Sequence, residues 1–421
     1  MNDLEALTQA VIADEADDLP RLVLADYLEE RDEPERAAFI RAQCEIAAAK
    51  PWSTVAVYAR HHRPDWLDGR DFRATLPQTS PRFVEWLASG PFHRGFGHAL
   101  HVRDLTAFLD VADSLFEQAP IKELHLPTAP LSEWRRFAER PWLPRVQSVH
   151  FFGISTPIEP IRVLCDSPRT TGLREIVFER AGSPAMPDLI AGLVRSPLAK
   201  TLRSLQFHVA SESVDELIGA FDSGPRRLNL DRLTFRVMNL NADLAGRILD
   251  RRLLESLSEF RVEFSPQLGN AGLRVFAKSP QLARLEVLQL PWNQITDAGA
   301  AVLASSPHLG NLKALDLSSN VLGPGGLRRL GRSKSLRGLR SLVVKNCRLW
   351  ADSPKALTEA NFWPNLVELD LSENRIADAS ALLAVPPPPN LAALVLRGNP
   401  LAEVEVKQLQ EHFRGRVAFG G

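Results

Sequence analysis

Five stretches of the sequence align without a gap: LEVLQLPWNQI from Leu285, LKALDLSSNVL from Leu312, LRSLVVKNCRL from Leu339, LVELDLSENRI from Leu366 and LAALVLRGNPL from Leu391. Each fits the pattern L-x-x-L-x-L-x-x-N/C-x-L, and successive stretches start 27, 27, 27 and 25 residues apart. A pattern that returns at a nearly fixed period predicts a repeat architecture, in which each unit buries its apolar face against its neighbours.

Weaker copies of the pattern precede these five. They start at Leu257, Leu230, Leu202, Leu173, Val146 and Ile121, and a first copy starts near Gly97. The sequence therefore predicts about twelve repeats over residues 97–401. The leucine content agrees with this prediction, because 39 of the 63 leucines lie between positions 201 and 400.

The pattern resembles the leucine-rich repeat family. Leucines at repeat positions 1, 4 and 6 point inward, and the short alternating stretch around them is a strand whose other side chains face away. Asn293, Asn320, Asn374 and Asn399 at position 9 are expected to form a ladder on neighbouring turns, with Cys347 as a structural replacement. The stretch after Asn293 predicts a helix capped by Asp297 and ended by Ser306 and Pro307.

A period of 27–28 residues with a full helix resembles the ribonuclease-inhibitor-like subfamily. The resemblance implies an α/β fold: a curved horseshoe with a parallel inner sheet and outer helices. We assign the repeats to residues 97–403 and a C-terminal cap to 404–421, because a solenoid needs covered ends. The proline run at 386–389 takes the place of part of one outer helix.

Residues 1–50 predict a small, acidic domain of three helices. They carry 13 acidic and 5 basic residues, a net charge of −8, whereas the rest of the chain is net +7. The string DDLPRLVLADYLEERDEPERAAFIRAQCEI resembles the repeat-companion domain at the N-terminus of many bacterial repeat proteins. Asp26 with Arg21, Arg36 and Arg41 forms either a binding constellation or an ion-pair network within the domain. Residues 51–96 predict a helical connector that caps the first repeat, with aromatic residues at Trp52, Trp66, Phe83 and Trp86.

Composition excludes several functions. No apolar run approaches the roughly 20 residues that a membrane helix needs, and a net charge of −1 argues against a dedicated nucleic-acid binder. The first ten residues do not resemble a secretory signal, and the three cysteines are too few and too scattered for a disulfide framework or a zinc site, so we expect a cytoplasmic protein. We find no catalytic motif and predict no enzyme activity and no cofactor.

Three histidines, His101, His125 and His150, occupy position 5 of three consecutive repeats and form what we call the histidine column. Strands about 4.8 Å apart would stack these rings. Three neutral imidazoles at this spacing could bind a transition metal or respond to pH, or they could be a solvated polar column without a ligand. His98 lies in the first of these repeats, and His208 lies two repeats beyond the third.

The remaining side chains of the inner face predict a protein-binding surface. Arginine and tryptophan are enriched at binding hot spots. The candidate partner-binding residues are Arg232, Arg236, Arg261, Phe264, Gln289, Trp292, Asp316 and Asp370. The leading hypothesis is a non-catalytic interaction module with a protein partner on this face. A metal or pH-sensing site on the histidine column is the alternative, and nucleic-acid binding ranks last.

Overall fold

In the computed structural model, the described residues are 3–14, 16–63, 96, 98–152, 158–179, 186–209, 214–221, 228–237, 239–250 and 253–418. The chain divides into two compact units. The first comprises residues 1–51, 58–185 and 196–202, and the second comprises residues 52–57, 186–195 and 203–421. Most of the predicted connector, including Trp66, Phe83 and Trp86, lies outside the described residues.

The first unit begins with the three predicted helices, α1 (Asp3–Ala13), α2 (Leu19–Glu29) and α3 (Pro34–Ala48). Prolines lie in the first turns of α2 and α3, where an amide hydrogen has no partner within the helix. The apolar faces of the helices meet in one buried cluster that contains Val11, Leu24 and Ile40. Phe96, which precedes the first strand, belongs to the same cluster. The helices are therefore packed against the first repeat by ordinary apolar burial.

The four charged residues singled out in this region do not converge on one point. Arg41 joins α3 to α2 by ion pairs of 2.6 Å to both Asp26 and Glu29. The buried Arg21 donates to the Asp17 carbonyl, and Arg36 pairs with Glu33. These contacts favour the interpretation as an ion-pair network over that as a binding constellation.

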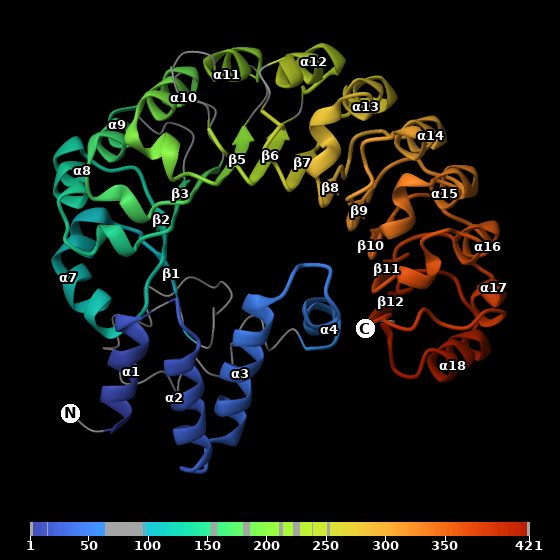
Figure 1. Ribbon diagram of the computed structural model, residues 1–421, viewed down its shortest axis with the longest axis horizontal. Coiled ribbons are helices and arrows are strands. Elements are labelled where there is room, and N and C mark those ends of the chain that lie inside the picture. Colours follow the sequence, from blue (N-terminus) through green and yellow to red (C-terminus); the bar gives the residue numbers. More distant parts are fainter. Residues whose placement is uncertain are drawn as a thin grey trace. The chain divides into compact units, whose positions relative to one another are not determined.

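The first unit continues with four parallel strands that pair in chain order as far as the described residues show: β1 (Ala99–His101), β2 (Glu123–Leu126), β3 (Ser148–Phe152) and β4 (Glu175–Glu179). Helices α7 (Leu105–Gln118), α8 (Leu131–Ala138) and α9 (Ile158–Asp166) follow the first three strands and lie on one side of them (Figure 1). Each strand begins at position 3 of a predicted repeat, so the predicted register is confirmed here.

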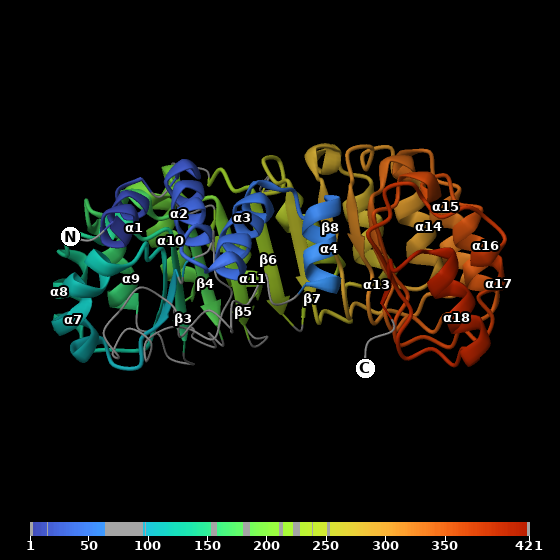
Figure 2. The same cartoon turned by 90° about the horizontal axis from the view of Figure 1, so that it is seen from below.

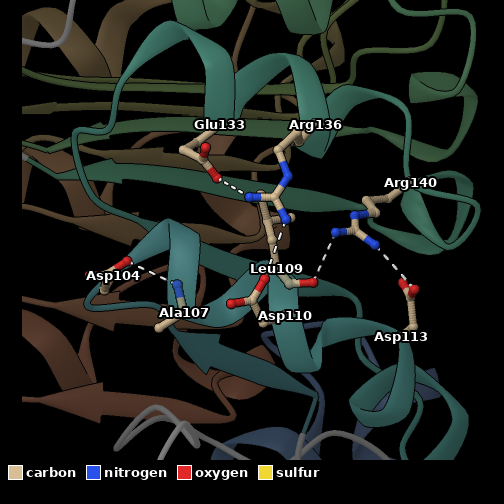
Figure 3. Close-up of polar contacts among 8 residues, drawn as sticks. All are labelled: Asp104, Ala107, Leu109, Asp110, Asp113, Glu133, Arg136 and Arg140. Carbon is tan, nitrogen blue, oxygen red and sulfur yellow. Dashed lines mark hydrogen bonds and ion pairs between the residues drawn. The ribbon is translucent and has the colours of Figure 1, made fainter.

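Polar contacts connect the outer helices of the first two repeats (Figure 3). Asp104 caps α7 by accepting a hydrogen bond from the Ala107 amide at 3.0 Å. Arg140, which follows α8, donates to the Leu109 carbonyl and pairs with Asp113 at 3.1 Å. The arginine thereby ties the end of one repeat to the helix of the preceding repeat.

The second unit contains the remaining described strands, which pair in chain order and in parallel. They are β5 (Ser204–Val209), β6 (Arg232–Val237), β7 (Glu259–Glu263), β8 (Val287–Gln289), β9 (Ala314–Asp316), β10 (Ser341–Val343), β11 (Glu368–Asp370), β12 (Ala393–Val395) and β13 (Val417–Ala418). β5 to β12 again start at position 3 of their repeats, and β13 belongs to the predicted cap. Figure 2 shows β5, β6 and β7 side by side.

Helices of the second unit lie on one side of its strands (Figure 1). They are α10 (Met186–Arg195), α11 (Val214–Ala220), α12 (Ala242–Asp250), α13 (Gly269–Ala277), α14 (Asp297–Ser305), α15 (Pro324–Gly331), α16 (Asp352–Thr358), α17 (Ser380–Leu383) and α18 (Glu403–His412). The α/β repeat fold is thus confirmed. α17 has only four residues, as the proline run after it predicts.

The predicted cap of α14 is wrong by one residue. Thr296 is the N-cap and accepts from the Ala298 amide, whereas Asp297 is the first residue of the helix. The Asp297 carboxylate instead accepts a hydrogen bond of 2.7 Å from the Gly323 amide, at the start of the next helix, α15. Asp297 therefore joins two repeats.

Buried asparagines at position 9 form the predicted ladder. Asn320 accepts hydrogen bonds from the Asn293 and Ile295 amides of the preceding repeat at 3.1 and 2.9 Å. Its amide group donates to the Leu290 and Leu317 carbonyls at 2.8 and 2.9 Å. One side chain thus satisfies four backbone groups that are shielded from water, and Asn374 repeats this arrangement two repeats later.

Cys347 takes the asparagine's place in one repeat. It is fully buried, and its thiol donates to the Leu317 carbonyl at 3.0 Å. Burial raises the pKa of this thiol to about 12, so the reactive thiolate is nearly absent at neutral pH. The residue is structural, as predicted.

Replacement of Asn320 by alanine should destabilise the second unit strongly. Two buried amides and two buried carbonyls would lose their partner, and an unsatisfied buried group costs about 1–3 kcal/mol, so we expect a loss of roughly 3 kcal/mol or more. Urea unfolding measures the loss, and amide hydrogen exchange at Asn293 and Ile295 localises it.

Asn311→Ala is the matched control, because Asn311 is exposed and makes one hydrogen bond, to the Ala283 carbonyl. This variant should lose no more than about 1 kcal/mol. Equal losses in the two variants would contradict the role assigned to the ladder.

Candidate functional site

An open pocket of about 750 Å³ lies on the strand face of the second unit. It is called the Trp292 pocket here, and its lining residues are Gln206, His208, Arg232, Thr234, Arg236, Glu259, Arg261, Glu263, Phe264, Pro291, Trp292, Asp316, Ser318, Ser319, Lys345, Asn346 and Glu373. Six of the eight predicted partner-binding residues are in this lining. Gln289 and Asp370 do not line the pocket. His208, which lies two repeats beyond the histidine column, does line it.

Charges in the pocket are paired both between neighbouring strands and within one strand. Arg232 on β6 pairs with Glu259 on β7 at 2.8 Å. Glu263, which is buried, contacts both Arg236 and Arg261. Basic and acidic side chains are equal in number in the lining, at four each if histidine is counted as neutral. The pocket therefore offers donors and acceptors without a strong field of either sign.

Two aromatic rings form the apolar part of the pocket. Phe264 and Trp292 stack with their centroids 5.6 Å apart and their planes at 16°. The Arg236 guanidinium lies over the Phe264 ring at 4.9 Å, within the range of a cation–π contact. Trp292 is 49% exposed, which is unusual for so large an apolar side chain.

These two aromatic residues occupy a backbone position that disfavours bulky side chains. Both have positive φ angles, 56° at Phe264 and 62° at Trp292. The same position 8 has a positive φ in the next four repeats, at Ser319, Asn346, Glu373 and Gly398. Its amide bonds to the following repeat, as Trp292 does to the Ser318 carbonyl at 3.1 Å and Ser319 to Lys345 at 2.8 Å. The ladder fixes the conformation, and the bulky residues carry a cost of about 1–3 kcal/mol.

The predicted acidic residues have local roles. Asp316 accepts a hydrogen bond from the Ser318 amide at 2.8 Å, and Asp370 accepts the same bond from Ser372. Burial raises the pKa of Asp316 even though Ser318 donates to it. Gln289 accepts from Arg261 at 3.3 Å. Asp316 borders the pocket, whereas Asp370 is buried away from it.

A segment of the connector covers the C-terminal part of this strand face. Val57, in the first turns of α4 (Thr54–His62), forms a buried cluster with Val367, Ala392 and Ala393. Within the second unit, the connector residues 52–57 thus pack near β11 and β12. Periodicity alone gave no sign of this contact, because the two partners are more than 300 residues apart in the sequence.

The histidine column exists in the first unit. The strand register pairs His101 with His125 and His125 with His150. The rings of His125 and His150 stack at 4.2 Å, whereas His101 and His125 are 5.5 Å apart and tilted. Sequence reasoning missed Glu123, whose carboxylate contacts His125 at 2.5 Å and lies 3.5 Å from His150. Its position two residues before His125 on the same strand was the available signal.

Similarity to a known family model is confined to three segments. A model described as "Leucine Rich repeat" matches residues 284–304, 308–331 and 364–382. The chain therefore contains leucine-rich repeats. No curated protein matches the sequence. Among the described residues, no helix combines the length and the apolar character needed to cross a bilayer.

Solved structures with a similar chain course are distant in sequence. An internalin, InlF, from Listeria monocytogenes is 17% identical, with 68% of this chain and 69% of that chain covered and a TM-score of 0.37. A chain of the yeast Rad7–Elc1 complex is 16% identical, with 96% and 95% covered and a TM-score of 0.48. A chain of the TLR13–ssRNA13 complex is 16% identical, with 73% and 42% covered and a TM-score of 0.39. At these values, the likeness says nothing about what this chain binds.

Replacement of Trp292 by asparagine should leave the stability unchanged or raise it by about 1 kcal/mol. Asparagine tolerates a positive φ, and Asn346 occupies the equivalent position two repeats later. The lost burial is small because half of the indole side chain is exposed. Urea unfolding checks this expectation.

Trp363→Asn supplies the contrast, since Trp363 is buried in the same unit and its replacement should cost about 3 kcal/mol or more. A loss above about 2 kcal/mol in Trp292→Asn would mean that the indole is retained for the fold.

Proposed function

We propose that the chain is a non-catalytic interaction module that binds a protein partner in the Trp292 pocket. The observation that carries the proposal is the Phe264–Trp292 stack, in which both residues have a positive φ and Trp292 is exposed. A positive φ is costly for a bulky side chain, and the exposed indole of Trp292 regains little of that cost by burial within the fold. Binding to a partner would supply the missing burial, and aromatic and arginine side chains in a concave site are typical binding hot spots.

The chemistry of the pocket favours a protein partner over a nucleic acid. Four carboxylates in the lining would repel phosphates, and the arginines are already paired with glutamates. We infer a partner that places an aromatic or aliphatic side chain against Trp292 and polar groups of both signs around it. Neither a cofactor nor a membrane surface is part of the proposal.

Finer assignments of family and location are also proposals. Repeats of 27–28 residues with outer helices support the ribonuclease-inhibitor-like subfamily, and the three helices before residue 50 support a bacterial repeat-companion domain. We also propose four domains with the boundaries predicted from the sequence: 1–50, 51–96, 97–403 and 404–421. Three free, buried cysteines, Cys44, Cys165 and Cys347, support a reducing, cytoplasmic location.

Affinity capture from lysate of the source organism tests the binding proposal. The wild type, Trp292→Asn and Trp350→Asn would be used as baits, with captured proteins quantified by mass spectrometry. Trp350 is the matched control, because it is 50% exposed in the same unit but does not line the pocket. We expect a protein that is retained by Trp350→Asn and reduced at least tenfold with Trp292→Asn.

A direct titration with the purified partner follows. Loss of about 2 kcal/mol or more of binding free energy in Trp292→Asn corresponds to a hot spot. The same captured set and the same affinity for all three baits would overturn the proposal. If nuclease treatment abolishes the retention of captured proteins by the baits, nucleic-acid binding would replace the proposal of a protein partner.

A further inference from the structure

Three histidines surround one carboxylate in the first unit. Glu123 and His125 are two residues apart on β2 and share a face, and His150 lies beside His125 on β3. His98 directly precedes β1. Its Nε2 atom lies 3.8 Å from Glu123 Oε2, while the Nε2 atoms of His125 and His150 lie 2.5 and 3.5 Å from Glu123 Oε1. These four residues form the Glu123 cluster.

The ligand atoms are close enough to share one ion. One ligand atom from each of Glu123, His125 and His150 lies within 4.8 Å of the other two. Metal–nitrogen and metal–oxygen bonds of about 2.0–2.2 Å place the ligand atoms of a tetrahedral ion at comparable separations. The distance of 3.5 Å from His150 Nε2 to Glu123 Oε1 already fits such a site.

His150 lacks the hydrogen bonds that a buried imidazole normally makes. Both of its ring nitrogens are inaccessible to solvent, and neither has a hydrogen-bond partner in the described part of the chain. Nε2 faces Glu123, and Nδ1 lies 3.8 Å from the Glu179 carboxylate on β4. In metal sites a carboxylate often accepts a hydrogen bond from the second ring nitrogen, and Glu179 is the carboxylate on that side of His150.

Aromatic packing shields one side of the cluster. Phe152 stacks on His125 with a centroid distance of 5.4 Å and lies 5.1 Å from His101. His101 is exposed and is not among the residues whose ligand atoms converge. The histidine column and the Glu123 cluster are therefore different sets, with His125 and His150 in common.

We propose that Glu123, His125 and His150, assisted by His98, bind a divalent transition metal, with zinc as the ion tested. Two or three imidazoles and a carboxylate are ligands suited to zinc. The His125 and His150 planes differ by only 14°, so binding requires the two rings to tilt until both Nε2 lone pairs point to the ion. The short contact from His125 to Glu123 opens in the same movement.

Zinc titration of the full chain after chelator treatment and dialysis tests the proposal. Isothermal titration gives the affinity, and elemental analysis gives the stoichiometry after removal of free metal. We expect one zinc per chain, and a thermal unfolding midpoint that rises with zinc concentration because the ion binds only the folded chain. Glu123→Gln and His150→Gln should each weaken binding by about 100-fold or more, beyond the 10–100-fold effect of second-shell changes.

Two controls separate the cluster from other histidines. His101→Gln removes a neighbour of the cluster, and His308→Gln removes a histidine of the second unit. Both should bind zinc within about twofold of the wild type. Circular dichroism and the midpoint of each metal-free variant establish that it is folded.

Several results would overturn the proposal. They are less than one zinc per chain at saturation, an unfolding midpoint that zinc does not change, and equal binding by the Glu123→Gln, His150→Gln double variant. Loss of affinity in His101→Gln but not in Glu123→Gln would instead assign the metal to the histidine column. The partner-capture result is independent of these outcomes, because the Trp292 pocket shares no residue with the cluster.

Discussion

The C-terminal repeats, from the one that starts at Leu285, depend on the hydrogen bonds of one buried side chain at the end of each strand. There the chain turns away from the sheet, and its amides and carbonyls lose both the strand ladder and water. Asn320 supplies four of the missing partners by itself, and Asn374 does the same two repeats later. Leucine burial gives the repeats most of their stability, but it is not directional. The asparagine ladder fixes the turn and hence the distance to the next strand.

The geometry of that turn also determines the backbone conformation of position 8, the residue just before the buried side chain. In the repeats that start between Leu257 and Leu366, the amide of position 8 donates to the following repeat, and the residue has a positive φ. Asparagine and glycine accept this conformation readily, and Ser319 and Glu373 also adopt it. Phe264 and Trp292 are the two aromatic residues at this position, and they stack in the open pocket. The turn requires a positive φ at this position, so stability of the fold does not explain why two aromatic residues occupy it.

Sequence periodicity predicted the elements well because the period itself determines the register. The strands from β1 to β12 all start at position 3 of their repeats, and Cys347 is buried in the ladder as its position requires. What periodicity could not supply is the environment of a side chain. Asp370 has the same repeat position as Asp316, but it is buried, in a region where Val57 covers neighbouring repeats from a distant part of the sequence. Likewise, the rotamer of Glu123, rather than its position, brings its carboxylate to His125 and His150.

The two candidate sites arise from the same parallel register but differ in their charge balance. In the Trp292 pocket, each arginine of β6 faces a glutamate of β7, so the lining satisfies its own charges and presents the aromatic rings as its unsatisfied feature. In the Glu123 cluster, one carboxylate contacts several imidazoles, and the buried nitrogens of His150 have no hydrogen bond in the described chain. A partner that buries the aromatic rings would complete the Trp292 pocket, and a bound cation would complete the Glu123 cluster. The same parallel register therefore underlies both the proposed protein contact in one unit and the proposed metal site in the other.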